Sequence, residues 1–213
     1  MKKKTYLKSL GVGGIALLCL CLTTLAGPTL QNGDFSSGLD FWNPEYGTVT
    51  DGGGFALFQE HATSLSSTLS QEFTIPALAL ELSFDVVMSL AGNYDTAEWA
   101  DAFTACLYDN STGFPLDNNP GVDDFFYIEH TGLFETVGSF DGTTVTLDVS
   151  AFRDMDAYLV FDLWANLYDG METSVSLDNV NISVIPAPGA LLLGLIGAGM
   201  VGLMRKSRVG KVI

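Results

Sequence analysis

The central part of this chain has almost no positive charge. Of its 213 residues, 25 are acidic and 9 are basic, and Arg153 is the only Lys or Arg between residues 27 and 185. All the acidic residues fall between Asp34 and Asp178, so 25 negative charges face one positive charge, a net −24 with His neutral. Nucleic acids and other polyanions are excluded as partners, because so acidic a domain would repel them. The charge favours a surface suited to cation-rich water, specific Ca²⁺ binding, or both.

Cysteine and catalytic signatures are equally scarce. Cys19 and Cys21 lie in the apolar start of the chain, so a chain that has lost this start keeps only Cys106 and forms no internal disulfide. His61 and His130 each follow a Glu, but neighbours on a strand point to opposite faces, and two isolated His are a weak basis for zinc binding or acid–base catalysis. No nucleophile elbow, zinc motif or ordered triad is present, so we expect no catalytic residue and no enzyme activity.

The N-terminal segment has the pattern of a secretory signal. A Lys-rich stem over residues 2–8 is followed by an apolar run from Leu10 to Leu25. A positive stem and a short apolar stretch direct export. We predict that residues 1–26 are a signal peptide cleaved after Ala26, and the alternative is an uncleaved N-terminal anchor.

The apolar residues of the remaining domain, residues 27–185, repeat with the period of a strand. Apolar and polar residues alternate over 80–90 and 144–149, which is typical of strands with one buried face. Further strands are expected at residues 103–108, 125–128, 133–137 and 158–163. The strand at 158–163 is expected to be central in its sheet because it is apolar on both faces. Turn-forming clusters of Asp, Asn and Gly separate them. The expected fold is all-β, an antiparallel β-sandwich of the jelly-roll type, with helices only in the terminal segments.

The last expected strand changes register. The apolar residues Val175 and Leu177 stand at odd-numbered positions, whereas the apolar residues Val180 and Ile182 stand at even-numbered positions. The slip predicts a β-bulge at Asp178 and its neighbour, and a bulge re-aims a side chain, here a carboxylate.

Two short elements near the ends of this domain resemble the galactose-binding-like and carbohydrate-binding-module jelly rolls. Residues 31–42 read QNGDFSSGLDFW and residues 177–180 read LDNV. In that family an Asn-Gly-(Asp or Gly)-Phe element forms the first strand and a Leu-Asp-(Asn or Asp)-Val element forms the last. The resemblance implies a structural Ca²⁺ between these strands, held by Asp34 and Asp178. It also gives the alternative function, a carbohydrate-binding module for exopolysaccharide.

Aromatic residues are the candidates for stacking on sugar rings. Trp42 and Trp164 stand in strand-like segments and are expected in the core. Tyr94 and Trp99 fall in the polar stretch 92–101, expected to be a loop, and are therefore the better candidates for ligand binding. A secreted glycoside hydrolase is a further alternative. It needs two carboxyls ~5–9 Å apart, and no local motif selects such a pair.

The C-terminal segment, residues 186–213, resembles a PEP-CTERM sorting tail. An uncharged stretch runs to Met204 and begins with the motif Pro186, Ala187, Pro188 and Gly189. At ~1.5 Å per residue it is long enough to span a membrane. It is followed by a basic cluster, expected to stay cytoplasmic, made of Arg205, Lys206 and Arg208.

In the PEP-CTERM family a membrane protease, the exosortase, recognises the motif and removes the helix. The departure in this chain is Ala187, which stands where the family name expects Glu. A plain single-span anchor is the alternative. The terminal segments together predict a non-enzymatic, exported protein that is membrane-anchored and then delivered to the cell surface or extracellular matrix.

Overall fold

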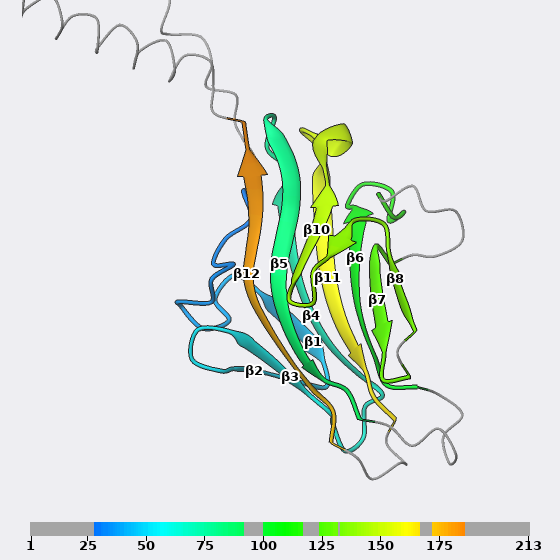
Figure 1. Ribbon diagram of the computed structural model, residues 1–213. Coiled ribbons are helices and arrows are strands. Elements are labelled where there is room, and N and C mark those ends of the chain that lie inside the picture. The colour runs from blue at the N-terminus through cyan, green and yellow to red at the C-terminus, as the bar shows by residue number, and fades with distance from the viewer. Residues whose placement is uncertain (1–27, 92–99, 117–123, 132, 167–171, 186–213) are drawn as a thin grey trace, which may run out of the picture.

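The computed structural model describes residues 28–91, 100–116, 124–131, 133–166 and 172–185, and their strands form two six-stranded sheets (Figure 1). Every strand pairing recorded in both sheets is antiparallel. The prediction of an all-β antiparallel sandwich is confirmed. The described residues contain a single short 3₁₀ turn, η1 (Ser150–Phe152), and no other helix.

Each sheet combines strands from distant parts of the sequence. The first, called sheet A, contains in spatial order β1 (Asn43–Tyr46), β4 (Ser66–Thr74), β11 (Asp156–Trp164), β6 (Ala102–Asp109), β7 (Phe126–Glu129) and β8 (Phe134–Thr136). The second, called sheet B, contains β2 (Thr48–Asp51), β3 (Ala56–Gln59), β12 (Ser174–Val184), β5 (Ala79–Ser89), β10 (Thr144–Asp148) and β9 (Ser139–Phe140). The chain crosses from one sheet to the other repeatedly, a connectivity typical of jelly rolls. The expected central strand is β11, which lies between β4 and β6.

A cluster of aromatic rings fills the space between the sheets. Phe161 on β11 is fully buried, and its ring centroid lies 5.0 Å from that of Phe84, 6.0 Å from that of Trp42 and 6.3 Å from that of Phe103. Edge-to-face and offset ring contacts of this kind add to the free energy gained by burying apolar surface. The expectation that Trp42 lies in the core is confirmed.

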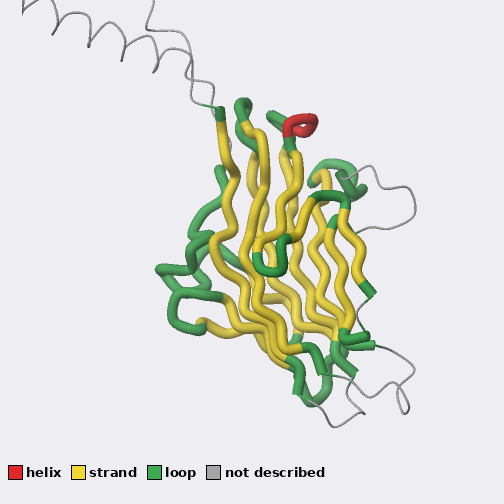
Figure 2. Tube along the Cα trace, in the orientation of Figure 1, coloured by secondary structure: helices red, strands yellow, loops and turns green. Residues whose placement is uncertain are grey.

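The opening segment, residues 31–42, is a series of turns, and the expectation that it forms the first strand is wrong (Figure 2). Asn32 and Phe35 have φ angles of 49° and 47°, which interrupt an extended chain. The side-chain amide of Asn32 donates to the carbonyls of Gly38 and Asp40, 2.9 Å each, and so closes a local loop. Hydrogen bonds of this type compete with strand pairing.

The opening segment is nevertheless attached to the last strand. The backbone N–H of Val180 on β12 donates to the carbonyl of Gly33 at 2.8 Å. A Cβ atom at position 33 would lie 1.8 Å from the carbonyl oxygen of Val180, so this close approach requires glycine.

Both ends of the described chain lie at the same end of the sandwich (Figure 1). The N–H of Thr74 donates to the carbonyl of Pro28, near the start of the described chain. The N–H of Ile185, at its end, donates to the carbonyl of Leu78, which is only four positions beyond Thr74. The predicted signal peptide, residues 1–26, and the predicted sorting tail, residues 186–213, lie outside the described residues. No helix within the described part of the chain has the length and apolar character needed to span a membrane.

Candidate functional site

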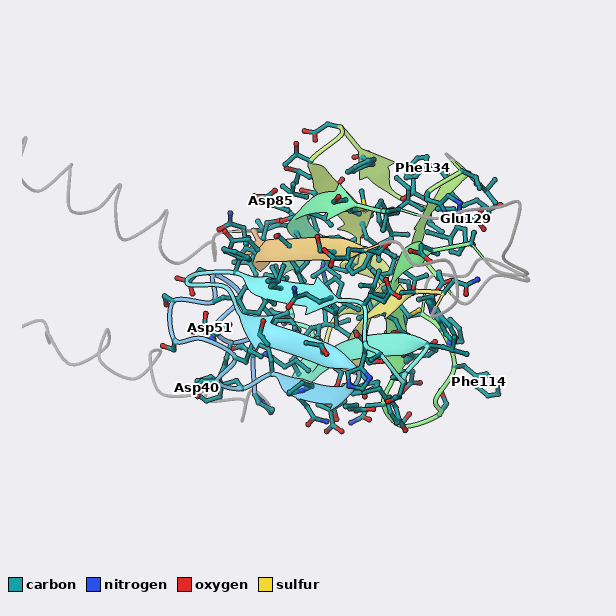
Figure 3. All side chains as sticks on the ribbon, turned by 90° about the horizontal axis from the view of Figure 1, so that it is seen from below. Asp40, Asp51, Asp85, Phe114, Glu129 and Phe134 are labelled. Carbon is teal, nitrogen blue, oxygen red and sulfur yellow. The ribbon has the colours of Figure 1, made fainter. Side chains whose placement is uncertain are left out.

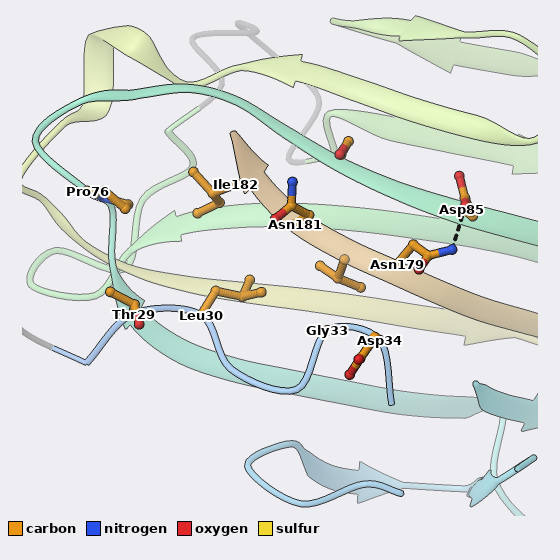
Figure 4. A pocket seen from close by; sticks show the side chains of 11 residues that line it. Thr29, Leu30, Gly33, Asp34, Pro76, Asp85, Asn179, Asn181 and Ile182 are labelled. Carbon is orange, nitrogen blue, oxygen red and sulfur yellow. Dashed lines mark hydrogen bonds between the residues drawn. The ribbon is translucent and has the colours of Figure 1, made fainter. Parts of the chain in front are cut away.

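Of the two residues predicted to bind calcium, Asp34 lines a pocket between the opening segment and β12, whereas Asp178 is not among its lining residues (Figure 4). Asp34 and Asn179 line this pocket, which has a volume of about 740 Å³. The predicted bulge is confirmed, because the register of β12 against β5 shifts between Asp178 and Asn181. At the bulge Asn179 has a φ of 52°, and its side-chain amide donates to Asp85 Oδ2 at 2.9 Å.

The carboxylates of Asp34 and Asp178 accept hydrogen bonds from the chain itself. The backbone N–H and the hydroxyl of Ser36 donate to Asp34 and hold its pKa below the usual value. Asp178 Oδ1 accepts from the backbone N–H of Asn179 at 2.6 Å. Within the part of the chain that the structure describes, no three Asp, Glu, His or Cys side chains come close enough together to hold a metal ion. Calcium binding through Asp34 and Asp178 stays a prediction.

The predicted ligand-binding residues Tyr94 and Trp99 lie outside the described residues. Other aromatic side chains gather on the outer surface of sheet A. We call the outward-facing side chains of β1, β4, β11, β6 and β7 the A face. Its members include Tyr108, Tyr127, Glu129, Tyr158, Asp162 and Trp164.

Antiparallel pairing sets the A-face side chains in rows across the strands. Tyr158 on β11 lies opposite Tyr108 on β6, and Trp164 lies opposite Ala102. Because Ala102 is small, it leaves room beside the Trp164 indole, and 49% of Trp164 is exposed. Tyr158 and Trp164 are six positions apart on one strand, about 20 Å at ~3.3 Å per residue. Aromatic side chains therefore stand at both ends of β11 on this face.

A second pocket, called the end pocket, lies at the Tyr158 end of the A face. It has a volume of about 300 Å³, and its two aromatic residues are Tyr158 and Phe41. Its polar side chains are Asn43, Glu45, Ser70, Gln71, Glu72 and Asn110. Phe41 is 66% exposed and has a φ of 73°, an unfavourable backbone angle for a residue with a Cβ atom. Strained residues of this kind concentrate at functional sites.

Hydrogen bonds fix the side chains of the end pocket. Glu45 Oε1 accepts from the Tyr158 hydroxyl at 2.6 Å, the Asn43 amide at 3.1 Å and the Ser70 hydroxyl at 3.2 Å. Burial, and then the bond to Glu45, raise the pKa of Tyr158 above its usual value. The tyrosine therefore stays a neutral donor, and its ring is held in one orientation against the pocket.

Asp162 lies near the middle of the A face. Its Oδ1 accepts from the hydroxyls of Ser66, at 2.8 Å, and Thr68, at 3.0 Å. Burial raises the pKa of Asp162, and the negative charge of Asp124 raises it further. The neighbouring Cys106 thiol donates to Asp124, and burial raises its pKa far above the usual value. Such a thiol is a poor nucleophile, so this face offers hydrogen-bond acceptors rather than a reactive group.

The outer face of sheet B has a different composition. Its outward positions on β5 include Ser83, Asp85 and Val87, and those on β12 include Ser174 and Ser176. Among the strand residues that the structure describes, none of the outward-facing side chains of sheet B is aromatic. The two faces of the sandwich are therefore unequal, and exposed rings are concentrated on sheet A.

The expectation that Trp164 lies in the core is wrong. Phe161 and Leu163 point inward from β11, so the alternation of a strand turns Asp162 and Trp164 outward. The sequence contained a usable signal for the exposure of Trp164. The inward positions of β11 are all apolar, and Trp164 stands at one of the alternate, outward positions. Phe41 had no such signal, since its position depends on the turns of the opening segment.

Comparison with known proteins assigns this chain to no family. No family model and no curated protein matches this chain. Among solved structures, the carbohydrate-binding module TmCBM61 in complex with β-1,4-galactotriose is 11% identical, with a TM-score of 0.44 over 74% of this chain and 99% of that one. A CBM4 structure is 14% identical, with a TM-score of 0.38 over 71% of this chain and 99% of that one.

A third neighbour is TmCBM27, a carbohydrate-binding module described as recognising mannan. It is 13% identical, with a TM-score of 0.37 over 72% of this chain and 95% of that one. At these identities and TM-scores the likeness assigns neither a family nor a ligand to this chain.

Proposed function

We propose that this chain is a non-enzymatic carbohydrate-binding protein whose A face holds a glycan, with the end pocket as its anchor. The observation that carries the proposal is the composition of the end pocket. Two aromatic rings, Phe41 and Tyr158, stand beside amide and carboxylate side chains in one cavity of about 300 Å³. A sugar ring presents an apolar C–H face and a rim of hydroxyls, so it needs both kinds of group.

The pocket is also arranged before a ligand arrives. Tyr158 is held by Glu45, and Asn110 donates to Glu72 Oε2 at 3.3 Å. Side chains that are already ordered lose less conformational entropy on binding. The rest of the A face extends this surface along β11 as far as Trp164, which suits an extended oligosaccharide rather than a single sugar.

The test is retention of the purified full chain on a panel of insoluble polysaccharides. We expect saturable retention by at least one of them, and Phe41→Ala should weaken it about tenfold or more, the effect of a typical aromatic anchor. Phe114→Ala is the matched control, because Phe114 is 72% exposed but does not line the end pocket. Equal retention of wild type, Phe41→Ala and Phe114→Ala would contradict the proposal.

A glycoside hydrolase would use the same kind of face, since two carboxyls ~5–9 Å apart are enough for that chemistry. The two functions differ in what happens to the glycan. A binding protein leaves the chain length of a soluble oligosaccharide unchanged, whereas a hydrolase shortens it. We expect no shortening after prolonged incubation.

Export and surface delivery form the second part of the proposal, and the sequence of the two ends supports them. Residues 1–26 have a signal pattern, and residues 186–213 have the pattern of an exosortase-sorted membrane anchor. The binding domain would then act at the cell surface or in the extracellular matrix. Intact-mass measurement on protein from cells tests this, because the mature chain should begin near Gly27 and, if sorted, lack the apolar segment. A mass equal to that of all 213 residues would contradict both processing steps.

A further inference from the structure

We infer that the A face selects neutral glycans and rejects those that carry carboxylate or sulfate groups. This inference rests on the proposed function and adds the chemical class of the ligand. It follows from the charges around the end pocket and along β11.

Carboxylates occur along the whole length of the A face. Glu45 and Glu72 line the end pocket, and Asp162 stands near the middle. Glu129 lies two strands away from Trp164, because Ala102 of β6 stands between them. Figure 3 shows Glu129 at the periphery of the sandwich, with further labelled carboxylates on other sides. An anionic sugar placed anywhere on this face would therefore lie close to negative charge, and like charges at short distance disfavour binding.

No basic side chain of the described domain compensates these charges. Carboxylates and sulfates are usually bound by Arg or Lys. Arg153 is the only such residue among those described, and its Nε donates to the carbonyl of Ala79 at 2.6 Å, at the start of β5 in sheet B. The A face thus contains acceptors for hydroxyl groups and no cationic partner for an acid group.

The hydrogen bonds at Glu45 support the same selection. This carboxylate accepts from Tyr158, Asn43 and Ser70, all through Oε1. A carboxylate has about four acceptor positions on its two oxygens, so it can accept further bonds from vicinal hydroxyls. A neutral sugar supplies such donors, whereas a uronate or sulfate adds acceptors and charge at the same place.

The experiment is native affinity electrophoresis of the full chain in gels containing one polysaccharide each. Neutral galactan, mannan and glucan are compared with polygalacturonate and a sulfated galactan, at low and at high ionic strength, with a chelator present so that divalent ions cannot bridge the charges. We expect retention by a neutral glycan that changes little with salt. Retention by the anionic glycans should be at least about tenfold weaker at low salt, where repulsion is least screened.

A charge reversal makes the test local. Glu72→Lys places a cation in the end pocket and should create retention by polygalacturonate. Glu81→Lys is the matched control, because Glu81 lies on β5 of sheet B and the change in net charge is identical. If both variants gain the same retention, the overall charge and not the A face rejects anionic glycans, and the inference is wrong.

The outcomes separate this inference from the proposed function. Strong low-salt retention of the wild type by polygalacturonate that Tyr158→Ala abolishes would overturn the selection for neutral glycans and leave glycan binding at this face intact. If no polysaccharide retains the wild type, or if Tyr158→Ala changes nothing, the proposed function fails and this inference fails with it.

Discussion

Replacement of Phe161 by Ala tests whether the aromatic cluster holds the two sheets together. Phe161 is fully buried on the central strand of sheet A and contacts rings from the opening segment, from β5 and from β6. Truncation of a buried Phe to Ala costs ~3–5 kcal/mol, because it removes buried apolar area and leaves a cavity. Small domains have a total unfolding free energy of only ~5–15 kcal/mol, so the loss is a large fraction of it.

The loss can be measured as a change in the midpoint of thermal or urea unfolding. For a domain of this size each kcal/mol shifts the thermal midpoint by about 2–4 °C, so Phe161→Ala should lower it by about 6–20 °C. Val87→Ala is the control, because Val87 is 66% exposed on the outer face of sheet B and should change stability by less than about 0.5 kcal/mol. A loss below about 1 kcal/mol for Phe161→Ala would show that these rings do not form the core described above.

Three further predictions concern charge and burial. Burial raises the pKa of Asp162 in the folded protein. The contribution of Asp162 to stability is therefore present below the unfolded pKa of about 3.9 and is lost as the pH rises through the folded pKa. Asp162→Asn should raise the melting temperature at pH 7, and this gain should shrink towards pH 3. A gain that does not depend on pH would contradict this account. Cys106 is buried, its thiol donates to Asp124, and the pKa of this thiol is raised. In a chain that lacks residues 1–26, and with them Cys19 and Cys21, a thiol reagent at pH 8 should therefore label Cys106 only after the protein has been unfolded. Rapid labelling of the folded chain would count against the described packing. NaCl should raise the melting temperature because it screens the net charge of −24 carried by residues 27–185. A calcium site at Asp34 and Asp178 predicts that Ca²⁺ at matched ionic strength raises the melting temperature further, and that Asp178→Asn removes this additional rise. Identical curves in the two salts would exclude such a site.

Strands β5 and β10 could be predicted from the sequence because each has a strong period-two pattern. The alternation over 80–90 corresponds to β5, and the register slip at Asp178 corresponds to the bulge of β12. Both patterns are local, since the buried face of a strand repeats every second residue whatever the strand pairs with. The order of the strands in the sheets could not be predicted, because it depends on contacts between distant segments.

The candidate site was harder to predict for the same reason. The end pocket joins Phe41, Tyr158 and Asn110, which lie far apart in the sequence and meet only through strand pairing and turns. The opening motif also resembled a strand but folds into turns, because Asn32 bonds to nearby carbonyls instead of to a partner strand. One local signal was available for the A face: Trp164 directly follows the buried Leu163 on a strand, so its side chain points to the opposite, outer face.

The most direct test of glycan binding at the A face is a calorimetric titration of the full chain with neutral oligosaccharides. The account predicts saturable binding that Tyr158→Ala and Trp164→Ala each weaken by about tenfold or more, which corresponds to ~1.4 kcal/mol. Phe114→Ala should leave the dissociation constant unchanged, because Phe114 does not line the end pocket. Saturable binding that neither Tyr158→Ala nor Trp164→Ala affects would place the ligand elsewhere on the molecule, and no binding to any neutral glycan would contradict the proposed function itself.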